Sequence, residues 1–205
     1  MLAIVDYGVG NLFSLCSSLE YIGESCIITG DKEEIRKSDR IILPGVGAFG
    51  DAMDKLKKSG LNTVIKEEAA SGKPLLGICL GMQMLFEKSY EYGEHEGLGL
   101  LSGEVRPLKG DISEKLNIPH MGWNALKLYG DCPIFKYTNE GDYVYFVHSY
   151  YAKGEREELC ASAEYDIDVT AAAFKNNVFG TQFHPEKSGE VGARILRAFC
   201  EIRRE

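Results

Sequence analysis

The chain has 205 residues, of which 44% are hydrophobic and 26% are charged, a composition typical of globular proteins. Its net charge of −8 argues against a general nucleic-acid binder. No apolar run approaches the roughly 18 residues needed to span a bilayer, so no membrane association is expected. The six cysteines are scattered without a C-x-x-C pair, which indicates neither a disulfide framework nor a metal site. We therefore expect a cytoplasmic protein forming a single domain over residues 1–205.

The first half alternates apolar runs typical of strands with helical patterns. Strands are predicted at residues 2–5, 25–29, 40–43 and 74–78, the third ending at Pro44-Gly45. Helices are predicted from an Asn11 cap to residue 22 and at residues 31–37, 49–58 and 61–70. This alternation predicts an α/β, flavodoxin-like three-layer fold, with a mixed, mostly parallel central sheet and helices on both faces. Ligands bind such sheets beyond the carboxyl ends of the strands.

The second half reads as strands followed by one helix. Strands are predicted at residues 104–108, 125–129, 143–147, 159–165, 170–174 and 178–183, as antiparallel additions to the same sheet, and an amphipathic helix at residues 189–204. Residues 90–99 are rich in Gly and Glu and predict a mobile surface loop, with Glu91, Glu94 and Glu96 solvated and His95 without a partner.

A five-residue segment, Gly77-Ile78-Cys79-Leu80-Gly81, lies between the fourth predicted strand and the helical pattern of residues 82–87. A nucleophile flanked by glycines at this junction is typical of a nucleophile elbow. The helix N-terminus favours a thiolate, and its free N–H groups can bind an oxyanion. A buried core cysteine is the alternative interpretation of this segment alone.

A second segment, His184-Pro185-Glu186, ends the last predicted strand. On an extended backbone His184 and Glu186 project to one side, where a carboxylate can orient the imidazole and stabilise its protonated form. If His184 meets Cys79, the three residues form a Cys-His-Glu triad. A histidine at a strand end is by itself more often structural, so the hypothesis depends on the two segments meeting.

Together the Cys79 elbow and the His-Pro-Glu segment resemble the class I, triad-type glutamine amidotransferases, and the resemblance covers nearly the whole chain. Four further segments, at residues 6–12, 44–49, 120–124 and 146–150, are similar to the branch of that family that serves imidazole glycerol phosphate synthase in histidine biosynthesis. The resemblance implies hydrolysis of L-glutamine to glutamate and ammonia through a glutamyl thioester, without a cofactor or metal.

The resemblance also implies roles for individual residues. Cys79 is the expected nucleophile, His184 the acid and base, and Glu186 its orienting group. The oxyanion is expected to bind the N–H of Leu80 and, after a peptide flip, an N–H of Val46-Gly47, since neighbouring glycines make a flip sterically cheap. Such a flip would leave the oxyanion hole incomplete until a partner is loaded. The expected contacts to glutamine's amino and carboxylate groups are Gln83, Ser149 and Tyr150.

The partner implied by the resemblance is a cyclase subunit with a TIM-barrel fold, forming a heterodimer with this chain and receiving its ammonia. The expected interface residues are Asn11, His120, Met121, Gly122 and Trp123, and His148 is expected to be structural. Two alternatives remain open. One is a glutaminase of another pathway, such as the subunit feeding pyridoxal phosphate synthase. The other is a cysteine hydrolase or a non-catalytic binding subunit on the same fold.

Overall fold

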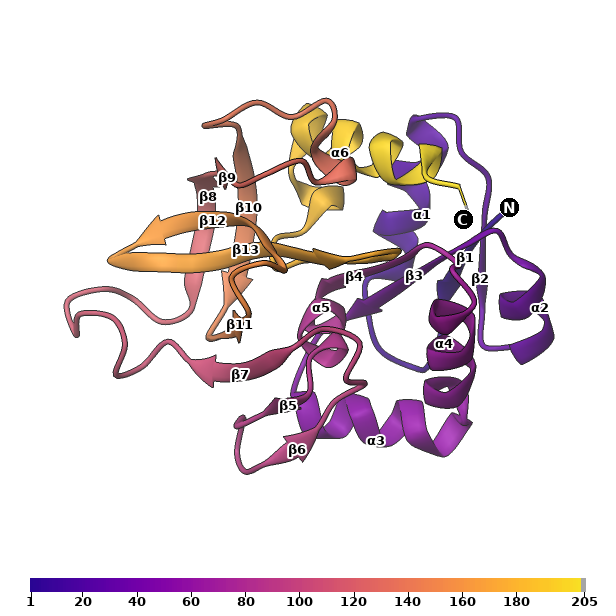
Figure 1. Ribbon diagram of the computed structural model, residues 1–205, viewed down its shortest axis with the longest axis horizontal. Helices are drawn as coiled ribbons and strands as arrows, with labels where there is room; N and C mark the ends of the chain where they lie inside the picture. The colour runs from indigo at the N-terminus through magenta and orange to yellow at the C-terminus, as the bar shows by residue number, and fades with distance from the viewer. Residues whose placement is uncertain (204–205) are drawn as a thin grey trace.

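The computed structural model describes residues 1–203 and follows the predicted alternation through the first half of the chain (Figure 1). The elements of this half are β1 (Leu2–Val5), α1 (Leu12–Tyr21), β2 (Cys26–Thr29), α2 (Lys32–Lys37), β3 (Arg40–Gly45), α3 (Phe49–Ser59), α4 (Leu61–Ala70), β4 (Leu75–Cys79) and α5 (Leu80–Leu85). Asn11 caps α1 by accepting the N–H of Ser14, as its side chain predicts.

The second half adds short strands, two single turns of 3-10 helix and a long final helix. They are β5 (Lys88–Ser89), β6 (His95–Glu96), β7 (Gly103–Pro107), β8 (His120–Ala125), β9 (Lys127–Leu128), η1 (Pro133–Phe135), β10 (Tyr143–His148), β11 (Tyr150–Gly154), β12 (Leu159–Tyr165), β13 (Ile167–Lys175), β14 (Val178–Thr181), η2 (Pro185–Lys187) and α6 (Gly189–Glu201). Within the described residues, no helix is long and apolar enough to cross a bilayer.

The central sheet has eight strands in the described part of the chain, in the order β2-β1-β3-β4-β14-β13-β12-β9. The first five strands are parallel and the last three pair antiparallel. Helices α1 and α6 pack on one face, whereas α3, α4 and α5 cover the other (Figure 1). Each face buries its own apolar cluster, as expected for three layers. The α/β class with a mixed, mostly parallel sheet is therefore confirmed.

The predictions for the second half were partly wrong. Only β9, β12 and β13 are antiparallel additions to the central sheet, and β14 joins it parallel to β4. β7 belongs to a separate sheet in the order β11-β7-β5-β6, and β10 pairs with β8 in a two-stranded sheet. The strand predicted at residues 125–129 contains β9, and only Ala125 of it belongs to β8, which begins at His120. Alternation of apolar residues indicates a strand but not its partner, because partners are fixed by tertiary packing.

The predicted end of the third strand at Pro44-Gly45 was also wrong, because β3 continues through both residues. Pro44 pairs with Ile78 and Gly45 with Cys79 along β4, whereas pairing with β1 already ends at Ile42. The N–H that proline lacks is therefore not needed on the β1 side. This extension places the end of β3 beside the cysteine.

The turn from β4 into α5 depends on two glycines that allow close backbone contact. A Cβ on Gly81 would lie 1.9 Å from the Leu43 carbonyl oxygen, and one on Gly45 would lie 2.7 Å from the Gly81 nitrogen. Side chains at these positions would push β3 away from α5. Glycine is required at both positions because no side chain fits between the two backbones. This requirement explains why a glycine follows Cys79 by two residues.

We expect Gly81→Ala to destabilise the fold by about 2 kcal/mol or more, because the methyl group overlaps the Leu43 carbonyl oxygen. The measurement is the free energy of unfolding in urea. Gly8→Ala is the control, since Gly8 has φ +85° but a Cβ added there would have no atom within 4 Å, so only backbone strain of about 1 kcal/mol is added. Equal losses in the two variants would contradict the steric explanation.

Candidate active site

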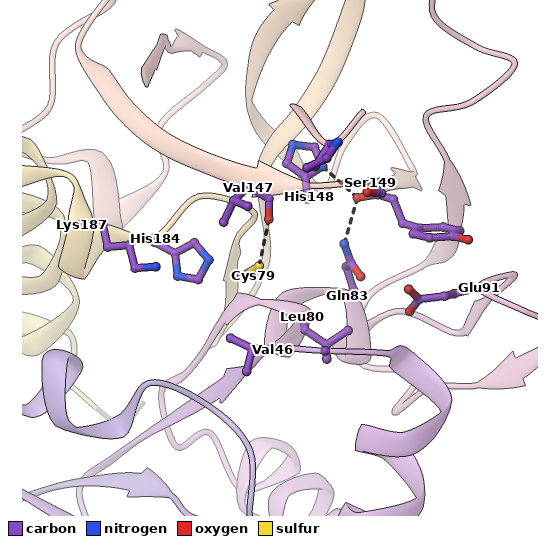
Figure 2. Close-up of a pocket in the computed structure, with 13 residues that line it drawn as sticks. Val46, Cys79, Leu80, Gln83, Glu91, Val147, His148, Ser149, His184 and Lys187 are labelled. Atoms are coloured by element: carbon purple, nitrogen blue, oxygen red, sulfur yellow. Dashed lines mark hydrogen bonds between the residues drawn. The ribbon is translucent and has the colours of Figure 1, made fainter. Parts of the chain in front are cut away.

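A cavity of about 350 Å³ opens at the carboxyl ends of β3 and β4, and both Cys79 and His184 line it (Figure 2). It is lined by Val46, Gly47, Cys79, Leu80, Gln83, Glu91, Pro119, Val147, His148, Ser149, Tyr150, His184 and Lys187. The structure therefore brings together residues that lie more than a hundred positions apart. The position is the one at which parallel sheets bind ligands.

Cys79 occupies a strained position between β4 and α5. Its φ of 55° and ψ of −112° lie outside the regions that residues with a Cβ normally adopt. Its thiol is 4.0 Å from the Val147 carbonyl oxygen and accepts the side-chain N–H of Gln182 at 3.8 Å. Such strain at a cysteine before a helix is typical of a nucleophile elbow.

His184 is fixed by its backbone and by both sides of its ring. Its N–H donates to the Tyr145 carbonyl at 2.9 Å, and its carbonyl accepts the Ser188 hydroxyl at 2.7 Å. Ring atom Nδ1 lies 2.7 Å from Glu186 Oε1, and the ring lines the cavity together with the Cys79 thiol. The His184 and Glu186 side chains are each 4% exposed. The imidazole is thus held between thiol and carboxylate.

These two partners determine the protonation of His184. Burial alone would lower the pKa of His184, but its interactions with Cys79 and Glu186 outweigh burial and raise the pKa to about 9. A protonated imidazole beside a sulfur is the arrangement that stabilises a thiolate. The three residues can therefore form a nucleophile with an acid and base beside it.

The expected oxyanion donors lie on the same wall of the cavity. Leu80 is the first residue of α5, so its N–H has no partner within that helix. Val46 and Gly47 follow the end of β3, where Val46 is 44% exposed and Gly47 has φ +91° with open space around it. Upstream, the Tyr7 hydroxyl holds the Pro44 carbonyl at 2.8 Å. Residues 46–47 are therefore free to change conformation beside a fixed strand.

Gln83 and Tyr150 form one end of the cavity. The Gln83 amide nitrogen donates to the Tyr150 carbonyl and to Gln182 Oε1, both at 2.9 Å. Both bonds use the nitrogen, so neither occupies the Gln83 side-chain oxygen. Gln182 is completely buried and links Gln83 to the Cys79 sulfur. Sequence analysis did not identify Gln182, although it lies only two residues before His184, within the strand predicted at residues 178–183.

His148 supports this end of the cavity through a hydrogen bond to the Tyr150 carbonyl. Its Nδ1 donates to the Tyr150 carbonyl at 2.9 Å, which leaves Nε2 to accept from His120 Nδ1 at 3.0 Å. His120 Nε2 then accepts the Asn124 side-chain N–H at 3.3 Å. Burial lowers the pKa of His120 to about 4, and burial with the nearby His120 lowers the pKa of His148 to about 3. Both rings are neutral at pH 7, as suits a structural role.

Glu91 is a cavity residue that the sequence analysis treated as solvated. It is half-buried, burial raises its pKa, and its Oε2 accepts the Phe49 N–H at 2.6 Å. His95, expected to lack a partner, packs its ring beside Gly50 and Phe49. The predicted loop at residues 90–99 contains β6, which pairs with β5. No local signal separates Glu91 from Glu94 and Glu96, because only the hairpin directs it inward.

The expected interface residues divide into exposed and buried positions. Met121 and Trp123 are each 63% exposed on β8, and the Trp123 ring packs edge-on against Tyr145 at 4.9 Å. His120 is 3% exposed and lies behind this surface. Gly122 has φ +129° on the same strand. Asn11 lines a small chamber with Val46 and Glu186. Phe13, which the sequence analysis did not single out, is 80% exposed on α1.

Comparison with known proteins agrees with this geometry. Residues 3–202 match the family described as glutamine amidotransferase class-I. This chain belongs to the class-I glutamine amidotransferase family.

Curated relatives of this glutamine amidotransferase carry a more specific name. It is 53% identical over 199 residues to "Imidazole glycerol phosphate synthase subunit HisH" of Bacillus cereus, covering 97% of this chain and 93% of the relative. It is 53% identical over 201 residues to the protein of the same name from Lactococcus lactis, covering 98% of each. The resemblance seen in the sequence is therefore confirmed.

Solved structures support the fold of the amidotransferase. A crystal structure titled as a glutamine amidotransferase matches with a TM-score of 0.76 at 18% identity, covering 97% of each chain. The structure of PurLQS from Thermotoga maritima matches with a TM-score of 0.75 at 20% identity, covering 97% of this chain and 96% of the other. At these identities the likeness shows the shared fold alone.

We expect Glu186→Gln to lower the pKa of His184 from about 9, because the carboxylate is lost while burial and the interaction with Cys79 remain. Histidine NMR titration measures the change, with the exposed Glu190→Gln as control. Folding raises this pKa in the unmodified protein, so the stability contributed by protonated His184 is full below pH 6.5 and is lost as the pH rises through about 9. An unchanged titration would exclude Glu186 as the stabilising partner.

Proposed function

We propose that this chain is the glutaminase subunit of an imidazole glycerol phosphate synthase, with Cys79, His184 and Glu186 as its catalytic triad. The observation that carries the proposal is that Cys79 and His184 line the same cavity, with the Glu186 carboxylate on Nδ1 of the His184 ring at 2.7 Å. The names of the curated relatives support the choice of synthase. In this proposal residues 1–205 act as one domain in the cytoplasm.

The first half of the reaction releases ammonia. The Cys79 thiolate attacks the side-chain amide carbon of L-glutamine, and a C–S bond forms as the carbonyl π electrons move onto oxygen. The oxyanion accepts hydrogen bonds from the Leu80 N–H and from the Val46-Gly47 segment. Protonated His184 gives its proton to the amide nitrogen and the C–N bond breaks. Ammonia departs, and a glutamyl thioester remains on Cys79.

The second half returns the enzyme to its starting state. Neutral His184 takes a proton from water as the water oxygen attacks the thioester carbon. The same donors stabilise the second oxyanion. The C–S bond then breaks, glutamate leaves, and the Cys79 thiolate again faces protonated His184. Throughout, Glu186 keeps Nδ1 of the ring protonated, so that the other ring nitrogen exchanges the proton.

Recognition of glutamine uses the far end of the cavity. A free amino acid carries an ammonium and a carboxylate, and the cavity offers complementary groups. The Glu91 carboxylate suits the ammonium, and the Gln83 carbonyl oxygen can accept one of its hydrogens. Ser149 and Tyr150 line the same wall and can donate hydrogen bonds to the α-carboxylate. These contacts would hold the side-chain amide toward Cys79.

The partner is proposed to be a cyclase subunit with a TIM-barrel fold, forming a heterodimer over this cavity. Exposed apolar side chains mark protein contact surfaces, and Met121 and Trp123 form such a surface next to the cavity. Trp123 packs on Tyr145, and the Lys187 ammonium lies 5.7 Å from the Tyr145 ring while Lys187 also lines the cavity. A partner docked there would receive ammonia directly from the site where it is released.

Cys79→Ser is expected to reduce glutamine-dependent synthesis by the complex by about 10³-fold or more, because serine is a much weaker nucleophile here. Ammonia-dependent synthesis should stay within about twofold of the unmodified complex, since the cyclase is unchanged. Both rates are measured by product formation, with glutamine or an ammonium salt as nitrogen source. Survival of glutamine-dependent turnover would show that Cys79 is not the nucleophile.

Glutamate release by the isolated chain is expected to be slow and to rise by about tenfold or more with the cyclase and its nucleotide ligand. The reason is that residues 46–47 must reorganise to complete the oxyanion hole. The measurement is glutamate formation with each component added in turn. Fast hydrolysis by the chain alone would argue against a gated site, and lack of stimulation by a histidine-pathway cyclase would favour a glutaminase of another pathway.

A further inference from the structure

The segment that connects β3 to α3 is held at both ends and free between them. At its upstream end, Gly45 pairs with Cys79 and the Pro44 carbonyl accepts the Tyr7 hydroxyl. At its downstream end, Phe49 begins α3 and its N–H donates to Glu91 Oε2 at 2.6 Å. Only residues 46–48 lie between these two anchors. Any change in the oxyanion donor that the Val46-Gly47 segment supplies must take place within them.

Glu91 acts as the cap of α3 from another part of the chain. Ala48 stands at the N-cap position and supplies no side-chain hydrogen bond, so the Phe49 N–H would otherwise lack an acceptor. A carboxylate at this position is also favoured by the helix dipole. The hairpin that carries Glu91 is seated on α3 by a second contact, since a Cβ on Gly50 would lie 2.7 Å from the His95 ring.

The same carboxylate faces the cavity, where it is the acidic group among the lining residues and therefore suits an ammonium. Glu91 lines the cavity together with Gln83 and Tyr150, and Tyr92 beside it packs edge-on against the Tyr150 ring at 6.4 Å. Glu91 has two oxygens, and one of them holds the Phe49 N–H. An ammonium bound at Glu91 therefore competes with or reorients the group that anchors residues 46–48.

We propose that Glu91 is a positioning residue that links binding of glutamine's α-ammonium to the conformation of the oxyanion segment, residues 46–48, through its hydrogen bond to the Phe49 N–H. The inference rests on the proposed glutaminase function and deepens it. It assigns Glu91 two separable tasks: binding the substrate charge and anchoring the start of α3. A substrate with an ammonium is then required for the segment to adopt the conformation in which it donates to the oxyanion.

Two substitutions of Glu91 separate these tasks in the complex with the cyclase. Glu91→Gln removes the charge but keeps an oxygen with two lone pairs, which can accept the Phe49 N–H and, at saturating glutamine, a hydrogen of the ammonium, so KM for glutamine should rise about tenfold or more while kcat stays within about threefold. Glu91→Ala also removes the anchor, so its kcat should fall about fivefold or more below that of Glu91→Gln. Glu94→Ala is the matched control, because Glu94 lies on the same hairpin, is exposed and is not a cavity residue.

Equal kcat values for Glu91→Gln and Glu91→Ala, with a raised KM in both, would reduce Glu91 to a binding residue and overturn the proposal. If the unmodified complex fails to hydrolyse glutamine, the proposed function itself is wrong, and the two failures are thereby distinguished. Thermal melting of each variant reports whether it is folded.

A second measurement avoids substitution of Glu91. In the Cys79→Ser complex, amide hydrogen exchange at residues 46–49 is measured with glutamine and with 4-carbamoylbutanoate, which has the same side-chain amide and carboxylate but no amino group. Glutamine should change the exchange of these amides by about threefold or more, and saturating 4-carbamoylbutanoate should leave it unchanged. The same change with both compounds would show that the ammonium is not the signal and would overturn the proposal.

Discussion

The close approach of β3 to the first turn of α5 is the constraint on which the site depends. Gly45 and Gly81 lack side chains, so the two backbones come close enough to place residues 46–47 beside the Cys79 sulfur. A nucleophile and the groups that stabilise its product charge must lie within a few ångströms of each other. Here that distance is set by contact between the two backbones, so it does not change when side chains move.

The rest of the site is assembled from distant parts of the chain around this contact. His184 follows β14, the neighbour of β4 in the central sheet, so the parallel pairing brings the imidazole to the same edge as the thiol. The smaller sheets then close the cavity, with Glu91 between β5 and β6 and Tyr150 at the start of β11. The sheet thus positions the reacting groups, and the added strands supply the walls that recognise substrate.

The parts of the molecule that could be predicted from sequence are those determined by local pattern. The strands and helices before Leu80 follow from apolar periodicity, and the elbow follows from the two glycines around Cys79. The pairing of β7 with β11 and of β8 with β10 could not be predicted, because a strand's partner depends on long-range packing. The inward position of Glu91 likewise depends on strand pairing, here of β5 with β6. Its place in the cavity could therefore not be predicted either.

Some features of the site required the three-dimensional arrangement even where the residues themselves were recognised. Gln83 was expected to touch substrate, but its amide nitrogen is already engaged by Tyr150 and Gln182, so its oxygen is the group left for a ligand. His120 was expected at a partner surface, yet it lies behind Met121 and Trp123 and supports His148. Family likeness suggests which residues matter, whereas hydrogen-bond partners determine which atoms are available.

In the row of hydrogen bonds from Asn124 through His120 and His148 to Tyr150, each group donates to the next. A carbonyl oxygen can only accept, so the Tyr150 end fixes the tautomer of His148 and, through it, that of His120. Reversing the row would leave the Tyr150 carbonyl facing an unprotonated nitrogen. Each imidazole therefore keeps one tautomer, and the Tyr150 carbonyl that accepts from His148 and from Gln83 is fixed in place by two donors.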